Sequence, residues 1–198
     1  MARVTVIRPL LLAMLLAALG ACNNAPPPPP TFPDLRFTAE PPIPLDARRT
    51  EIVPSYRPGS GPTHVEERPP LALPHVAETW ARDRLRAVGA RGTVVATITD
   101  ASVTETALPK EQGFRATFTR QLDTRYEARV AITVELRDER GVMLRTATAR
   151  AERSRTTVEG TTLDERDRLL YQLETELMAD LDRELETQIR DHFGFYVR

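Results

Sequence analysis

"TRYEARVAITVELRD", residues 124–138, alternates apolar and charged side chains over its whole length. The apolar positions are Tyr126, Ala128, Val130, Ile132, Val134 and Leu136. The positions between them are mostly charged: Arg125, Glu127, Arg129, Thr133, Glu135 and Arg137. A period of two over this length predicts a β-strand with one buried face and one solvated face, as is typical of an antiparallel sheet.

Two further strands are predicted on either side of this one. Residues 93–106, "TVVATITDASVTET", are rich in β-branched side chains. Asp100 is the oddly placed acid within that run. We interpret it as the site of a β-bulge or hydrogen-bonded turn rather than as a catalytic acid. "DERG", residues 138–141, predicts a turn into a strand from residue 142, where Ala147, Ala149 and Ala151 line one face. These side chains are small enough for a helix to lie close.

Two helices are predicted around the strands. Apolar side chains recur every three or four positions from Leu73 to Val88, and Gly89 suits the position after a helix end. Trp80 lies at the centre of that apolar face, so we interpret it as a core residue instead of a platform for a ligand.

The second helix is predicted over residues 163–192. Thr162 and Glu165 fit a capping box at its start. An apolar stripe then follows: Leu170, Leu173, Leu177, Leu181, Leu185 and Ile189. Five carboxylates are predicted for its solvated face: Glu174, Asp180, Asp182, Glu184 and Glu186. The stripe suits a coiled-coil dimer or a neighbouring sheet, and the matching apolar face of the sheet favours the second.

Prolines mark the organisation of the rest of the chain. Fifteen of the 17 prolines lie between Pro26 and Pro74, and the run Pro26–Pro30 predicts an extended spacer. Pro54 limits the short apolar run before it to the edge or the end of a sheet. We therefore divide the chain into residues 1–21, a linker over residues 22–48, and one domain over residues 49–198.

The fold class predicted for that domain is α+β. Its antiparallel sheet has three to four strands, two helices pack on one face of the sheet, and the Arg/Glu face is left open.

The first 22 residues resemble a bacterial lipoprotein signal with its lipobox. Arg3 and Arg8 precede an apolar stretch over residues 10–19 that is too short to span a membrane, and Leu19-Gly20-Ala21-Cys22 ends it. The resemblance implies that Cys22, the chain's only cysteine, is acylated and becomes the N-terminus after cleavage. It implies a lipid anchor in the outer membrane, on its periplasmic face, because Asn23 stands where an inner-membrane signal has aspartate.

The order of elements over residues 49–192 resembles the compact α/β domain of two bacterial lipoprotein families. One is the lipopolysaccharide-assembly lipoprotein that plugs an outer-membrane barrel, and the other is the auxiliary lipoprotein of lipid-handling ABC transporters. The resemblance implies an accessory or assembly factor for an outer-membrane or lipid-transport complex, with a membrane protein as partner. An alternative is a carrier domain that binds an amphiphile, a phospholipid or lipopolysaccharide, between the helices and the sheet.

Motifs for catalysis or cofactor binding are absent from the sequence. His64, His75 and His192 are far apart and lack metal-ligand spacing, and no nucleotide-binding fingerprint occurs. The formal charge of −1 gives no electrostatic reason to expect nucleic acid. We therefore expect no enzyme, metal or cofactor. A hydrolase that uses Asp100 with another acid or with His64 is the remaining catalytic hypothesis.

One loop and one sheet face are candidate partner surfaces. Residues 109–123 are too many for a tight hairpin and carry four candidate contacts: Phe114, Arg115, Phe118 and Arg120. The two phenylalanines are equally compatible with the core. Arg125, Arg129 and Arg137 stand on the open sheet face, where interleaved glutamates favour an ordinary solvated surface.

We expect Cys22→Ser to abolish lipid attachment and to block the cut before residue 22. The folded domain should survive, because every predicted core stripe lies beyond residue 70. Metabolic labelling with a radioactive fatty acid checks this, with label on the wild type and none on the variant. Label that persists on the Cys22→Ser protein would contradict the lipoprotein interpretation.

Overall fold

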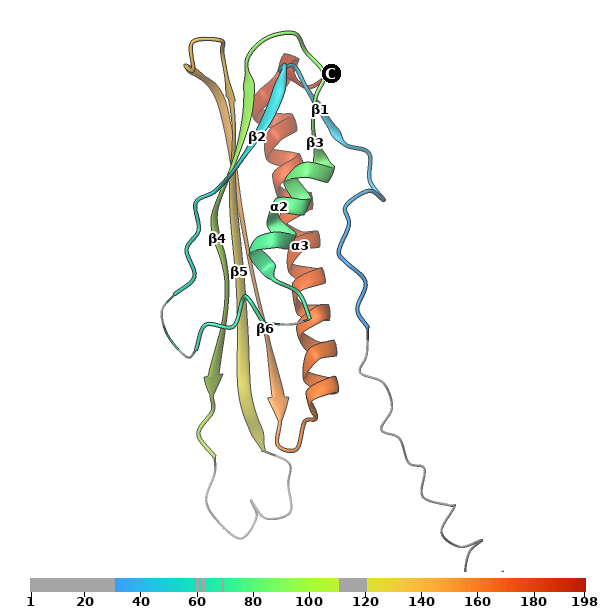
Figure 1. The fold of residues 1–198 in the computed structure, drawn as a ribbon, viewed down its shortest axis with the longest axis vertical. Helices are drawn as coiled ribbons and strands as arrows, with labels where there is room; N and C mark the ends of the chain where they lie inside the picture. Colours follow the sequence, from blue (N-terminus) through green and yellow to red (C-terminus); the bar gives the residue numbers. More distant parts are fainter. Residues whose placement is uncertain (1–30, 60, 62, 69, 111–120) are drawn as a thin grey trace, which may run out of the picture. The chain divides into compact units, whose positions relative to one another are not determined.

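A computed structural model describes residues 31–198, apart from residues 60, 62, 69 and 111–120. Residues Phe32–Arg198 form one compact unit (Figure 1). Its elements are β1 (Ile43–Leu45), β2 (Arg49–Pro54), α2 (Leu73–Arg84), β3 (Leu85–Ala87), β4 (Thr93–Ala107), β5 (Leu122–Arg137), β6 (Met143–Val158), α3 (Leu163–Phe193) and the 3₁₀ turn η3 (Gly194–Tyr196). Cys22 lies outside the described residues.

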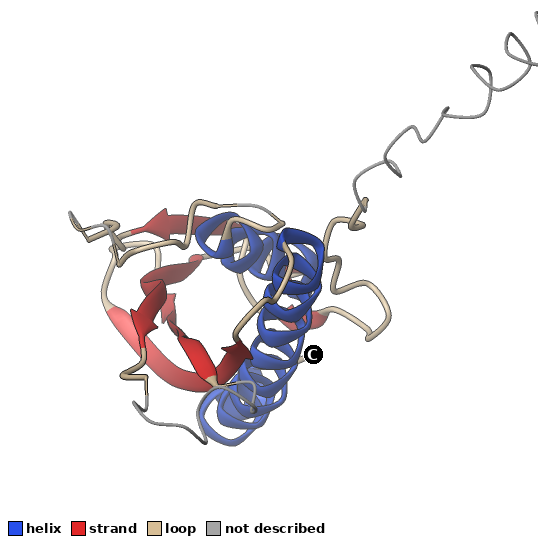
Figure 2. Ribbon diagram, turned by 90° about the horizontal axis from the view of Figure 1, so that it is seen from below, coloured by secondary structure: helices blue, strands red, loops and turns tan. Residues whose placement is uncertain are grey.

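The main sheet has four strands in the order β2-β4-β5-β6, and β1 and β3 form a separate pair. The α+β class is confirmed, with both helices on one side of the sheet (Figure 2). The sheet is mixed, however, because β2 lies parallel to β4. A parallel pair needs a crossover connection, and here the chain between the two strands contains α2. β2 is an edge strand that ends at Pro54, as predicted.

The alternation of β5 is confirmed at its six predicted apolar positions, while Ala131 on the other face is buried as well. All six apolar positions from Tyr126 to Leu136 are buried. In β4 the buried positions change phase, from Val94, Ala96 and Ile98 to Ala101 and Val103. The register shifts between Ile98 and Asp100, which leaves Thr99 as the extra residue of a bulge. The bulge predicted at Asp100 is therefore confirmed within one residue.

Helix α3 begins with the predicted capping box. The Thr162 side chain accepts the N–H of Glu165, and the Glu165 carboxylate accepts the N–H of Thr162 at 2.8 Å. All six members of the predicted stripe are buried, and they pack on β6 and β5, where Ala147 and Ala149 allow a close approach. No helix in the described part of the chain is long and apolar enough to cross a membrane.

Helix α2 is one turn shorter than predicted. It ends at Arg84, and Leu85–Ala87 form β3, in which Leu85 pairs with Ile43 of β1. Gly89 therefore does not cap a helix. A Cβ at Gly89 would lie 2.1 Å from Asp46 Oδ1, so glycine is needed for the close approach of two loops.

The folded unit begins earlier than the boundary predicted at residue 49. Ile43 and Leu45 are fully buried. Arg36 forms two hydrogen bonds to Asp83 of α2, at 2.8 and 2.7 Å, and they hold the pKa of the Asp83 carboxyl below its usual value. The segment was assigned to the linker because its prolines mask the apolar residues that pack against the core.

Arg84 carries a fully buried guanidinium between the two helices and the N-terminal segment. Its Nε donates to Asp182 Oδ1 at 2.7 Å, and its other nitrogens donate to Glu186 and to the carbonyl of Pro41. Trp80 is fully buried, as predicted for a core residue, and its Nε1 donates to Asp182 Oδ1 at 2.8 Å. Asp182 was predicted for the solvated face, but its carboxylate serves this network.

Glu174 was also predicted for the solvated face, and that prediction is wrong. The residue is 3 % exposed, and its Oε2 has no hydrogen-bond partner in the described structure. Burial raises the pKa of Glu174 to about 8. The carboxyl is therefore mostly protonated at neutral pH, since burying an unpaired charge costs far more than holding a proton.

We expect Arg84→Ala to lower the free energy of unfolding by about 3 kcal/mol, because it removes the buried cation between Asp182 and Glu186. Glu186 keeps its exposed partner Arg190. Arg82→Ala is the matched control. Its side chain is 46 % exposed and pairs with Glu78 at 3.4 Å, so the loss should stay below about 1 kcal/mol. Urea unfolding followed by circular dichroism measures both, and equal losses would contradict the role of the buried network.

We expect the free energy of unfolding to fall as pH rises from 4.5 towards 8. In that window the folded Glu174 carboxyl keeps its proton while the unfolded one, at its ordinary pKa of 4.5, releases it. The slope from this group is about 1.4 kcal/mol per pH unit. Its stabilising contribution is complete below pH 4.5 and lost above pH 8.

Glu174→Gln should flatten this dependence, and Glu184→Gln, at an exposed position of the same helix, should leave it unchanged. Urea titrations between pH 5 and pH 9 measure the slope in each protein. The same slope in Glu174→Gln as in the wild type would show that another group is responsible.

Candidate functional site

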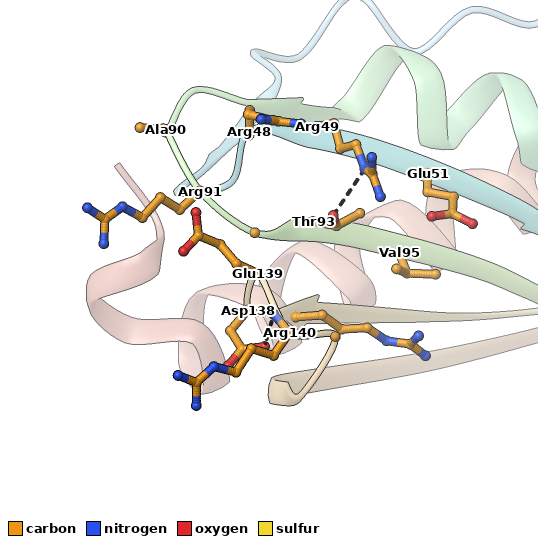
Figure 3. A pocket seen from close by; sticks show the side chains of 13 residues that line it. Arg48, Arg49, Glu51, Ala90, Arg91, Thr93, Val95, Asp138, Glu139 and Arg140 are labelled. Atoms are coloured by element: carbon orange, nitrogen blue, oxygen red, sulfur yellow. Dashed lines mark hydrogen bonds between the residues drawn. The ribbon is translucent and has the colours of Figure 1, made fainter.

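Three connections meet at one end of the sheet and enclose an open cleft of about 460 Å³. They are the β1–β2, β3–β4 and β5–β6 connections (Figure 3). Five arginines line the cleft: Arg48, Arg49, Arg91, Arg137 and Arg140. Three acids also line it: Glu51, Asp138 and Glu139. We call this the arginine cleft.

Local backbone chemistry holds the loops of the arginine cleft in place. The Arg48 N–H donates to the carbonyls of Arg91 and Gly92, at 3.1 and 3.2 Å. Gly92 has a φ of +74°, and a Cβ there would lie 2.4 Å from the Arg137 carbonyl oxygen. Only glycine fits both conditions, so β3–β4 and β5–β6 can approach each other closely at this point.

Asp138 shapes the third loop, and one of its carboxylate oxygens is occupied by backbone hydrogen bonds of that loop. Its Oδ1 accepts the backbone N–H groups of Arg140 and Val142, at 2.9 and 2.8 Å. This arrangement makes a turn that Gly141, with a φ of +82°, completes. The "DERG" turn predicted from the sequence is thereby observed, and it projects Arg140 from its tip (Figure 3).

The five arginines of the cleft differ in their partners. Arg49 donates to Thr93 Oγ1 at 3.2 Å, and Arg137 is paired with Glu135. Within the described ranges, the side chains of Arg48, Arg91 and Arg140 have neither a hydrogen bond nor an ion pair. All three are exposed. The cleft therefore presents unpaired guanidinium groups, which bind planar carboxylates and phosphates in bidentate fashion.

The partner surfaces predicted from the sequence have different outcomes. The four candidate contacts on the loop of residues 109–123 lie outside the described residues: Phe114, Arg115, Phe118 and Arg120. Their role as a partner surface therefore stays a prediction. On the open face of the sheet Arg129 pairs with Glu127 and, at 3.1 Å, with Glu152. Arg137 pairs with Glu135. Glutamates on the sheet itself neutralise these cations. The open face of the sheet therefore offers a partner less unpaired positive charge than the arginine cleft does.

A polar cluster forms around one of the two residues of the hydrolase hypothesis. His64 Nδ1 lies 3.2 Å from Glu66 Oε1, and Tyr56 Oη donates to the same oxygen at 2.5 Å. Burial would raise the pKa of Glu66, but the hydrogen bonds from Tyr56 and from the Val103 N–H hold it below its usual value.

The other residue of that hypothesis makes no hydrogen bond to the cluster. Asp100 Oδ1 accepts the N–H of Ser102 at 3.1 Å. Burial and the hydrogen bond to Glu66 raise the pKa of Tyr56. The negative charge of Asp100 raises the same pKa further. Tyr56 thus stays protonated and is a poor nucleophile. The geometry fits a structural tie between β4 and the segment before α2.

The other two histidines lie apart, in the first turn of α2 and the last turn of α3. Across residues 31–198, with the gaps named above, no three histidine, cysteine or carboxylate side chains are grouped as a metal site would require. The arginine cleft was missed by the sequence analysis. Its cations come from three separate turns, and only the strand register brings them together.

The described unit is thus an α+β sandwich of two helices on a mixed sheet, with a cationic cleft built from loops. No family model matches the chain, and no curated protein matches it. Among solved structures, a minor lipoprotein from Acinetobacter baumannii is 13 % identical with a TM-score of 0.41, covering 74 % of this chain and 93 % of that one.

The rare lipoprotein B from Shewanella oneidensis is 14 % identical with a TM-score of 0.38, covering 73 % of this chain and 96 % of that one. At these identities and TM-scores no property of either protein is transferred to this chain.

Proposed function

We propose that this protein is a lipid-anchored lipoprotein of the bacterial envelope that acts, without catalysis, as an accessory or assembly factor of a larger membrane complex. The observation that carries the proposal is the lipobox-like run Leu19–Cys22, placed ahead of a proline-rich segment and a folded unit. An acylated Cys22 would hold the chain at the outer membrane, since each buried methylene adds about 0.8 kcal/mol.

The arginine cleft is the surface of the folded unit that we assign to the partner. Its three unpaired cations come from three loops, and loops carried by a rigid sheet are where binding residues concentrate. A membrane protein that presents carboxylates to the cleft would find bidentate partners already exposed. Such contacts are screened at physiological salt over about 8 Å, so we expect the association to weaken as salt rises.

A second candidate function is binding of an amphiphile through its anionic headgroup. The interior between helices and sheet is an unsuitable place for an acyl chain, because buried side chains fill it. Each of the following is at most 1 % exposed: Trp80, Leu173, Leu177, Leu181, Ile98 and Ile132. The same unpaired arginines favour a headgroup bound at the cleft instead. Phosphate and carboxylate share the chemistry that guanidinium recognises.

We expect the full chain, pulled down from detergent-solubilised membranes, to recover one specific membrane protein. The variant Arg91→Ser/Arg140→Ser should recover several-fold less, because it removes two of the three unpaired cations. The control Arg57→Ser/Arg168→Ser removes two exposed arginines elsewhere and should behave as the wild type. Recovery of abundant bystanders alone, or equal recovery by both variants, would contradict the proposal.

The same three proteins separate the two candidate functions when mixed with vesicles of zwitterionic lipid, with and without an anionic phospholipid. Binding to anionic vesicles that the Arg91→Ser/Arg140→Ser variant loses, together with no specific protein partner, would favour the headgroup. A specific protein partner without vesicle discrimination would favour the accessory role.

A further inference from the structure

Strand β6 forms one edge of the four-stranded sheet over 16 residues. One side of β6 pairs with β5 along its length. On the other side, no strand of the described chain pairs with it, and residues 143–157 make no backbone–backbone hydrogen bond beyond those of the sheet. Two of its carbonyls, those of Leu144 and Ser154, accept from the side chains of Arg145 and Arg155. Alternate residues of such an edge direct N–H and C=O groups outward, which is a template for another strand.

The middle of this edge is accessible. A groove of about 740 Å³ runs between residues 148–152 of β6 and one flank of α3. The flank contributes Asp180, Arg183, Glu184 and Thr187. The unpaired edge is therefore open at its centre, and α3 stands beside it without covering it.

The side chains on the solvated face of β6 are Thr146, Thr148, Arg150, Glu152, Ser154 and Thr156. Contacts within the sheet confirm this orientation. Thr148 Oγ1 lies 3.0 Å from Thr133 Oγ1, and Glu152 pairs with Arg129 at 3.1 Å. Arg150 is exposed and, in the described structure, has no hydrogen bond or ion pair.

This series is self-complementary about Ala151. If a second β6 lies antiparallel with Ala151 opposite Ala151, then Arg150 faces Glu152 of the second copy and Glu152 faces its Arg150. Thr148 faces Ser154, and Thr146 faces Thr156. Opposite charges and hydroxyl pairs directly across from each other stabilise antiparallel strands.

The neighbouring registers are disfavoured by the same residues. A centre at residue 150 would place Arg150 opposite Arg150, and a centre at residue 152 would place Glu152 opposite Glu152. Like charges directly opposite are destabilising. On the helix side of the sheet, Ala147 and Ala149 face Arg155 and Arg153 of the second copy, so small side chains leave room for long ones.

We propose that two copies of this chain associate through β6, antiparallel about a two-fold axis at Ala151, and form one continuous sheet. The helix layers of both copies then lie on the same face. The α3 flank beside the groove fits this arrangement, because Arg183 has acids on either side of it, Asp180 and Glu184. When two copies of that flank lie antiparallel, the Arg183 side chain of one copy lies near the carboxylates of the other.

Cysteine substitution tests the register directly. In the proposed pair the two Ala151 Cα atoms are about 4.5–5.5 Å apart, within the span of a disulfide. Full-length Ala151→Cys, oxidised mildly in isolated membranes, should give a covalent homodimer on a non-reducing gel. Thr146→Cys should not, because its two copies lie about 33 Å apart. The wild type reports any band that arises through Cys22.

Charge exchange tests the interaction itself. By sedimentation of the detergent-solubilised full chain, we expect Arg150→Glu to weaken the dimer about tenfold, since it places like charges opposite each other twice. Adding Glu152→Arg should restore association. Arg168→Glu makes the same charge change at a distant exposed site and should have no effect.

The outcomes are decisive in both directions. A homodimer band for Ala151→Cys together with rescue by the double exchange would establish the interface. A monomer at all concentrations, a dimer without the Ala151→Cys band, or a cross-link to a different envelope protein alone would overturn the proposal.

Discussion

The buried guanidinium of Arg84 constrains how the helix layer sits on the sheet. A charge inside a protein is tolerated only when it is paired, and the partners here come from two separate segments: Asp182 and Glu186 on successive turns of α3, and the carbonyl of Pro41 in the N-terminal segment. A shift of α2 by one turn would move the Arg84 guanidinium away from all three acceptors. The network therefore holds both helices and the entering chain in one arrangement.

The sheet contributes a second constraint through the length of its strands. β4, β5 and β6 span 15, 16 and 16 residues. One phase of alternation does not persist along β4, and the bulge at Thr99 changes the phase so that Ala101 and Val103 again face the helices. The same length gives the sheet a long edge at β6. The long strands that bury the core thus also create the unpaired edge.

Local patterns predicted those parts of the fold that local physics decides. The alternation in residues 124–138 identified six buried positions of β5 and missed Ala131, which is buried on the other face. Thr162 with Glu165 identified the start of α3. The end of α2 at Arg84 was not predictable in this way, because its ion-pair partners lie 98 and 102 residues later in the chain. Glu174 was assigned to solvent for the same reason: its charge suggested exposure, and only the packing of distant segments around it shows burial.

The candidate site was less predictable than the fold, since loops carry its residues and the register of the strands decides which loops meet. Cys22 is a property of a short linear pattern and stays a sequence prediction. The arginine cleft and the β6 edge share no residue, and about ten residues of strand separate Arg140 from Ala151. Antiparallel pairing at Ala151 would therefore place two clefts at opposite ends of a continuous sheet. A partner bound to either cleft would not compete with self-association, so the two surfaces are independent in physical terms.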